Sequence, residues 1–171
     1  MALRWLGALA GVAAVILPAA AAAQSPPQTT PQALFESTIL ADPRTTSLVA
    51  GLLRSDAAHI SPRPAFADLT GDGREDAVVG VGSGGAAGTV AVYVLSADGT
   101  KSGRLRVVFR SQSLYRARTL TARGTFTVLQ PQYATGDDLC CPAGRIERDY
   151  VWNAKDKRLR HHATTKISLR D

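Results

Sequence analysis

Residues 68 to 76 are the stretch whose residue types and spacing best suit a chemical role. Carboxylates stand at loop positions 1, 5 and 9, and a hydroxyl stands at position 3: Asp68, Asp72, Asp76 and Thr70. Ca²⁺ takes about six to eight oxygen ligands, which a tight loop of alternating acidic residues supplies. Gly73, at position 6, permits the sharp turn that folds such a loop back on an ion. The loop predicts Ca²⁺ as a cofactor and predicts no reaction.

The same acidic residues also suit a loop that holds no metal. In that alternative, Asp68 and Asp72 accept hydrogen bonds from backbone N–H groups as Asx turns. Three neighbouring carboxylates repel one another unless a cation or protons neutralise them, which favours the metal. An EF-hand is the poorer match, because its position 12 would be Val79 rather than a bidentate glutamate.

The stretch from Phe66 to Val79 resembles the calcium loop of FG-GAP/VCBS repeats, which form the blades of integrin-like propellers. The resemblance implies a calcium site made by four side chains and one carbonyl: those of Asp68, Thr70, Asp72 and Asp76, and the carbonyl of Arg74. Thr70 stands where that family usually has Asp or Asn. Only one such repeat is present, whereas several blades are needed to close a propeller, so a propeller built from this chain alone is excluded.

A wider stretch resembles small exported proteins of the LppP/LprE lipoprotein type. The acidic loop is followed by strand-like segments, by Cys140-Cys141-Pro142 and by an aromatic strand that ends in a hairpin. The resemblance implies an exported compartment and a fold rather than an activity. The chain has no cysteine near its expected cleavage site, where a lipoprotein would carry its lipid.

Cys140 and Cys141 are adjacent and are the only cysteines of the chain. An oxidising compartment favours pairing, so the options are a vicinal disulfide, two free thiols or bonds between chains. A vicinal bridge would form a rigid turn, and such a turn would also offer an apolar surface for contacts. The C-x-x-C spacing of redox enzymes is absent.

The formal net charge is +6, and much of the positive charge is arginine in one region. Arg104, Arg106 and Arg110 are expected on one strand face, and Arg116 and Arg118 on the next. This pattern predicts either a solvated outer face or a surface for an anionic envelope polymer. No specific nucleic acid is expected, because Tyr115 is the only aromatic residue close by for base stacking.

Residues 1–23 are expected to be a signal peptide, with Arg4 before an apolar run and Ala21-Ala22-Ala23 as the cleavage signal. Residues 24–31, rich in Gln, Pro and Thr, are expected to form a disordered leader, and 32–171 a single domain. No other apolar run approaches the roughly 18 residues of a membrane span. The expected location is therefore the periplasm or the outside of the cell.

Helical periodicity runs from Ala33 to Leu53, interrupted at Pro43, and Thr45 or Thr46 could cap a second helix. After His59 the pattern is that of strands, one of which alternates Leu105, Val107 and Phe109 as its buried face. The predicted fold is α+β, with an N-terminal helical segment covering a mostly antiparallel, meander-like sheet of about seven strands.

Together these patterns favour an exported, non-enzymatic, calcium-stabilised binding or interaction domain, with the ligand, partner and oligomeric state left open. One alternative is a basic module that binds anionic envelope polymer. Another is an envelope enzyme or inhibitor that uses residues 137–152, with Asp138, Tyr150 and a histidine in one cleft. The chain has no Ser-His-Asp order and no His-Glu-x-x-His, Walker or Gly-x-Ser-x-Gly motif, which favours a non-enzyme.

Overall fold

The computed structural model describes residues 30–97, 103–122 and 124–170, so the expected signal peptide and most of the expected leader lie outside it. Two helices precede nine strands: α1 (Pro31–Ala41), α2 (Ser47–Arg54), β1 (Ala58–Ile60), β2 (Ala65–Ala67), β3 (Asp76–Ser83), β4 (Thr89–Ala97), β5 (Leu105–Gln112), β6 (Arg118–Ala122), β7 (Thr125–Gln132), β8 (Gly144–Asn153) and β9 (Arg158–Ser168). The α+β class and the antiparallel order are confirmed.

The strands form two sheets rather than the expected one, and the described residues contain nine strands rather than about seven. Sheet A has the order β1-β3-β4-β5, with β2 also paired to β3, and sheet B is the meander β6-β7-β8-β9. The two extra strands, β1 and β2, have three residues each and pair in tandem with the same strand, β3. Segments this short carry almost no periodicity, so the sequence pattern does not reveal them.

Local signals set the ends of the helices. The Thr30 hydroxyl accepts a hydrogen bond from the N–H of Ala33, and Pro31 begins α1. Thr46 caps α2 in the same way, through the N–H of Val49. The expected disordered leader is therefore too long by two residues: Thr30 caps the helix and Pro31 begins it, because a hydroxyl cap followed by proline starts a helix well.

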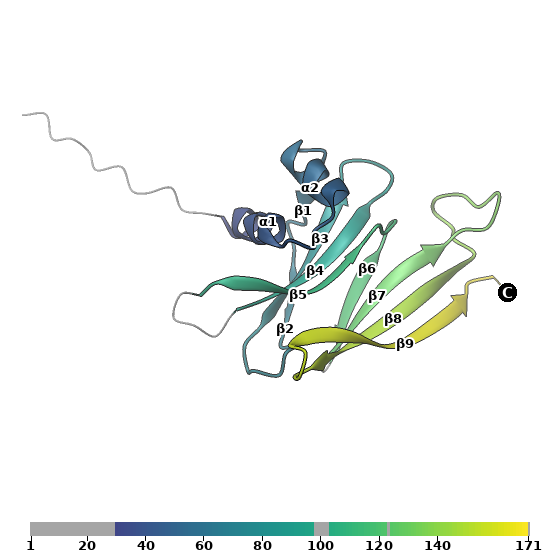
Figure 1. Cartoon of the computed structure of the whole chain (residues 1–171). Coiled ribbons are helices and arrows are strands. Elements are labelled where there is room, and N and C mark those ends of the chain that lie inside the picture. Colours follow the sequence, from purple (N-terminus) through teal and green to yellow (C-terminus); the bar gives the residue numbers. More distant parts are fainter. Residues whose placement is uncertain (1–29, 98–102, 123, 171) are drawn as a thin grey trace, which may run out of the picture.

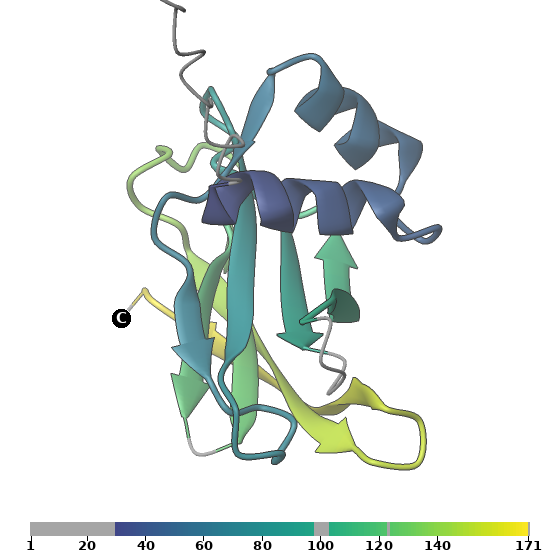
Figure 2. The same ribbon diagram turned by 90° about the vertical axis from the view of Figure 1, so that its left-hand side faces the viewer.

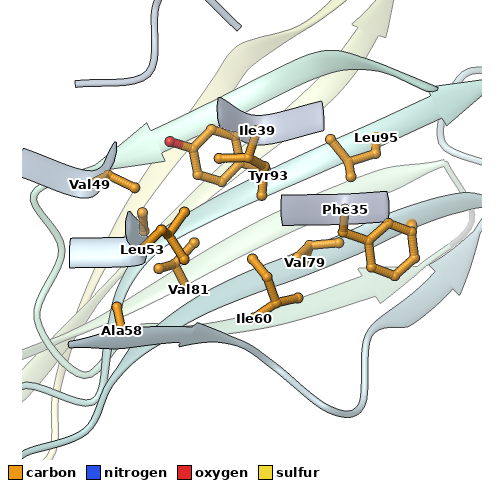
Figure 3. Packing of buried hydrophobic residues seen from close by; sticks show 12 residues of the cluster. Phe35, Ile39, Val49, Leu53, Ala58, Ile60, Val79, Val81, Tyr93 and Leu95 are labelled. Carbon is orange, nitrogen blue, oxygen red and sulfur yellow. The ribbon is translucent and has the colours of Figure 1, made fainter. Parts of the chain in front are cut away.

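The molecule has three layers: the helices, sheet A and sheet B (Figures 1 and 2). Between the helices and sheet A, Phe35 and Ile39 of α1 pack on Val79 and Leu95 (Figure 3). Between the two sheets, Val92 and Val94 pack against Phe126 and Val128 of β7. Since β3 and β4 are covered on both faces, they are apolar along almost their whole length.

A β-bulge in β5 changes which residues share a face. Val94 pairs with Phe109 and the next residue, Leu95, pairs with Val107, so Val108 is the extra residue. Val107 consequently packs under the helices, whereas Phe109 packs between the sheets. The expectation that Leu105, Val107 and Phe109 share one buried face is wrong for Phe109, because the bulge reverses the alternation.

Candidate functional site

The acidic loop joins β2 to β3, and the hairpin brings its two ends together. Ala67, the last residue of β2, pairs with Asp76, the first residue of β3. Asp68 and Asp76 are thus fixed near one another by strand pairing. Gly71 and Gly73 take positive φ angles of 72° and 80°, a conformation that glycine adopts at little cost.

Asp68 organises the turn by accepting backbone hydrogen bonds. Its Oδ1 accepts from the N–H groups of Gly71 and Asp72 at 2.7 and 3.2 Å, and its Oδ2 accepts from Gly73 at 3.0 Å. Hydrogen bonds to a carboxylate are stronger than those between neutral groups. The Asp68 side chain therefore holds three consecutive N–H groups of the loop around itself.

Asp76 closes the same loop from inside the protein. Its residue is 1% exposed, and its Oδ2 accepts from the N–H groups of Leu69 and Thr70, both at 2.9 Å. A buried carboxylate needs such donors, since burying it without partners is costly. Asp76 thus links the start of β3 to the first turn of the loop.

Asp72 is held by Arg74, two residues further on. Its Oδ1 accepts from the Arg74 N–H at 3.0 Å, and its Oδ2 lies 2.6 Å from Arg74 Nη2. The side-chain hydrogen bond from Arg74 is the largest cause that lowers the pKa of Asp72. The Asp72 carboxylate is therefore ionised at neutral pH and already faces a cation.

In the described part of the chain, no three acidic, histidine or cysteine side chains form a group that could hold a metal ion. The contacts of Asp68 and Asp72 match the metal-free Asx-turn alternative. One feature does not: Thr70 Oγ1, at loop position 3, is buried and makes no hydrogen bond of ordinary geometry, although it lies close enough to contribute slightly to the lowered pKa of Asp72. The calcium site stays a prediction.

The sulfur atoms of Cys140 and Cys141 lie at disulfide distance, which favours the vicinal bridge among the three options. The pair lies in the loop from Tyr133 to Ala143, between β7 and β8. Asp137 holds that loop: its Oδ2 accepts from the N–H groups of Ala134 and Ala143 at 2.7 and 2.9 Å, and its Oδ1 pairs with Arg170. With its side chain 2% exposed, Asp137 is a structural acid.

The enzyme alternative predicts that Asp138, Tyr150 and a histidine share one cleft. Tyr150 packs between the sheets against the rings of Phe109 and Phe126, at centroid distances of 4.5 and 6.1 Å. His161 lies at the edge of the Tyr150 ring. The groove beside the 133–143 loop is lined by neither Asp138 nor Tyr150 nor a histidine.

The arginines of β5 do not form one basic face. Arg106 lies over the Trp152 ring on the side of sheet B, whereas Arg110 pairs with Asp42 on the side of the helices. The bulge at Val108 separates them. The expectation that Arg104, Arg106 and Arg110 share a face is therefore wrong for Arg106 and Arg110.

A different set of arginines lines one groove of about 410 Å³ on the outer face of sheet B, which we call the arginine groove. Its charged residues are Arg116, Arg118 and Arg145, and the rest of its lining includes Tyr133 and Cys140. The sequence pattern placed Arg116 and Arg118 together but did not join them to Arg145. The sequence does carry one signal for this groove. Leu129 and Pro131 alternate along the strand with the buried Phe126 and Val128, which places their apolar side chains on the outer face of the sheet.

No protein-family model, no curated protein and no solved structure matches this chain. The resemblances to FG-GAP/VCBS repeats and to LppP/LprE-type lipoproteins therefore stay predictions. Within the described ranges, neither helix has the length and apolar character needed to cross a membrane.

Proposed function

We propose that the chain is an exported, non-enzymatic binding domain that calcium stabilises at the 68–76 loop. The observation that supports the calcium site is the buried Thr70 hydroxyl, which lacks a hydrogen bond of ordinary geometry at loop position 3. A buried hydroxyl without a partner is costly, and a cation next to its oxygen would remove that cost.

The residues that would hold the ion are the side chains of Asp68, Thr70, Asp72 and Asp76 and the Arg74 carbonyl. The ion would neutralise the loop carboxylates. For the Asp72 carboxylate it would compete with the guanidinium of Arg74, which lies 2.6 Å away. Arg74 is thus the internal alternative to a metal, and the two possibilities predict different responses to calcium.

The test is thermal unfolding of the purified protein in excess chelator and in millimolar calcium. Binding to the folded state alone adds about 1.4 kcal/mol when the calcium concentration is ten times Kd. For a domain of this size, that corresponds to a rise in Tm of about 3–6 °C. An equal Tm in chelator and in calcium would overturn the calcium proposal.

Three variants sharpen the test. Asp72→Asn should abolish the calcium-dependent rise, whereas Glu75→Gln, which removes the same charge from an exposed position at the same loop, should keep it. Arg74→Ala should lower Tm in chelator and enlarge the rise with calcium, because it removes the competing cation. If Arg74→Ala also shows no response to calcium, the loop is metal-free and Arg74 is the structural cation.

A binding role is favoured over catalysis by the contacts of the acids in the 137–152 region. The Asp137 side chain is buried, accepts from two N–H groups of its loop and pairs with Arg170, and Asp149 accepts a hydrogen bond from Thr127 Oγ1 at 2.6 Å. Export is tested separately: the N-terminus of the protein recovered from outside the cytoplasm should be Gln24.

A further inference from the structure

The arginine groove has a strong imbalance of charge. Arg116, Arg118 and Arg145 line it, and no acidic residue does. Arg145 Nε lies 2.8 Å from Glu147 Oε1, so this charge is partly neutralised. Among the residues that the structure describes, the guanidinium groups of Arg116 and Arg118 form no ion pair. Two cations at one groove without a counter-charge favour an anion there.

Part of the groove lining is apolar, which distinguishes the groove from a purely basic surface. Leu129 and Pro131 of β7 form its floor, because they alternate along the strand with Phe126 and Val128, which point to the opposite face, between the sheets. Leu139 and Leu169 line the groove while each is 50% exposed. Large exposed apolar side chains next to unpaired cations suit a ligand that has both an anionic and an apolar part.

Register places the charged residues on both sides of that floor. Arg118 of β6 pairs with Leu129, and Arg145 of β8 pairs with Pro131. Paired residues of neighbouring antiparallel strands lie on the same face of a sheet. The two arginines therefore flank β7 on its outer face, one strand to each side.

The wall of the groove is held in place by hydrogen bonds within the protein. The Tyr133 hydroxyl donates to the Leu139 carbonyl at 3.0 Å, and the Cys141 N–H donates to the Asp138 carbonyl at 2.9 Å. The C-terminal segment is attached to the same loop, since the Leu169 N–H donates to the Ala143 carbonyl at 2.9 Å. A site ordered in advance loses less entropy when it binds.

Arg116 is held in a costly backbone conformation. Its φ is 50°, in the left-handed region, where a residue with a Cβ is strained. Its N–H donates to the Ala87 carbonyl at 2.8 Å, and Gly88 lies against its backbone. Residues kept in such conformations are concentrated at functional sites, and here the conformation places a guanidinium at the groove.

We propose that the arginine groove binds a small organic oxyanion, a carboxylate or a phosphate, that is joined to an apolar body. The oxyanion would accept hydrogen bonds from Arg116 and Arg118, whose planar forks match both groups. The apolar body would lie on Leu129, Pro131, Leu139 and Leu169. A volume of about 410 Å³ falls within the usual range of small-molecule sites. The proposal locates the binding site of the domain and does not depend on calcium.

The test is an NMR titration of the ¹⁵N-labelled protein with two probes, 4-phenylbutyrate and phenyl phosphate. Saturable shifts are expected for one of them, centred on the amides of Leu129, Leu139 and Cys140. Two comparison probes lack one part each: 4-phenylbutanol has no charge, and acetate has no apolar body. Each should bind at least about tenfold more weakly than the better probe, because the proposed site uses both parts.

A pair of variants with equal charge change separates the groove from general electrostatics. Arg116→Gln/Arg118→Gln should raise the Kd of the better probe at least about tenfold. Arg54→Gln/Arg63→Gln removes the same charge from exposed positions outside the groove and should leave Kd unchanged. Equal loss in both double variants, equal binding of 4-phenylbutanol, or no saturable shift with either oxyanion would overturn the proposal.

A third variant covers a failure of the first to fold. Leu139→Ala changes an exposed loop side chain, so folding should be unaffected. It should weaken the better probe at least about threefold through lost apolar contact, and an unchanged Kd would count against the proposal. If the oxyanions bind while calcium has no effect on Tm, the groove stands and the calcium proposal fails; the opposite pair of results rejects the groove alone.

Discussion

The carboxylate of Asp42 and the guanidinium of Arg110 form an ion pair although 68 positions separate them in the chain. Asp42 is the C-cap of α1, and Arg110 lies in β5. Both Nε and Nη2 of Arg110 contact Asp42 Oδ2, at 2.7 and 2.6 Å, and the two side chains are only 18% and 7% exposed. The pair therefore fastens the end of the first helix to sheet A.

Removing one member of this pair should destabilise the protein markedly. Arg110→Met leaves the Asp42 carboxylate with little solvent and should lower the free energy of unfolding by about 3 kcal/mol. Arg44→Gln is the matched control, because Arg44 contacts the same carboxylate at 3.8 Å from a 53% exposed position. Its effect should stay below about 1 kcal/mol. Urea denaturation measures both, and similar losses for the two variants would contradict the assignment.

The parts of the fold that follow from local chemistry are predictable from the sequence. Pro43 ends the first helix region, Thr46 caps the second helix, and alternation with turn residues marks most of the strands. The division into two sheets is not predictable in this way, because no residue pattern states which consecutive strands pair. The faces of β5 are also missed, since a bulge at Val108 is set by pairing with β4 and leaves the residue types unchanged.

Pro131 is a second case in which the residue types alone do not determine the structure, here the end of a strand. Proline usually interrupts a sheet, so a strand is expected to end just before it. In the structure β7 continues to Gln132, because β6 begins opposite Leu129 and leaves that side of Pro131 without a neighbouring strand. Tertiary context therefore decides whether this proline ends the strand.

The two candidate sites also differ in how far the sequence predicts them. The acidic loop is visible in sequence because all its groups lie within nine consecutive positions, but residue types alone do not say whether each oxygen accepts from N–H groups or from a metal. The arginine groove joins residues from 116 to 169 that only the register of sheet B and the 133–143 loop bring together.

Stability should fall at alkaline pH because of Tyr93. Burial is the largest cause that raises the pKa of Tyr93 above its ordinary value of 10.0, and its hydroxyl donates to Gln112 Oε1 at 3.0 Å. The unfolded chain releases this proton near pH 10, whereas the folded protein keeps it to higher pH. The stabilising effect is therefore complete below pH 10 and is lost as pH rises above it, with a slope of at most about 1.4 kcal/mol per pH unit.

Tyr93→Phe separates this effect from other alkaline titrations. It should lower the free energy of unfolding by about 1 kcal/mol at pH 7, through the lost hydrogen bond. Above pH 10 its stability should fall less steeply than that of the wild type, so the two curves should approach one another. Urea unfolding from pH 7 to 11 provides the comparison, and parallel curves would show that Tyr93 does not ionise on unfolding.

Asp76 should contribute to stability even without a metal. Asp76→Asn replaces a buried acceptor of two backbone N–H groups with a neutral amide, which should lower the free energy of unfolding by about 1.5–3 kcal/mol in chelator. Glu75→Gln, at the exposed neighbouring position, should change it by less than about 0.5 kcal/mol. A loss that appears only in calcium would instead assign Asp76 to the metal alone.

Arg116 should show opposite effects on stability and on binding. Glycine has no Cβ and accepts a φ of 50° without strain, which should recover about 1–2 kcal/mol. The greater freedom of glycine in the unfolded chain offsets about 0.5–1 kcal/mol of this. Arg116→Gly should therefore raise the free energy of unfolding slightly, by about 0.5–1 kcal/mol, and should weaken the binding of the oxyanion probe.

Arg116→Lys is the control for Arg116→Gly, because it keeps both the positive charge and the strained backbone conformation. It should leave stability near that of the wild type and should recover only part of the affinity, since an ammonium group lacks the planar fork. Urea denaturation and the NMR titration measure the two quantities on the same samples. If glycine both destabilised the protein and left the Kd of the probe unchanged, the left-handed Arg116 would be a structural feature of the β5–β6 connection, and the strain would serve the fold rather than the groove.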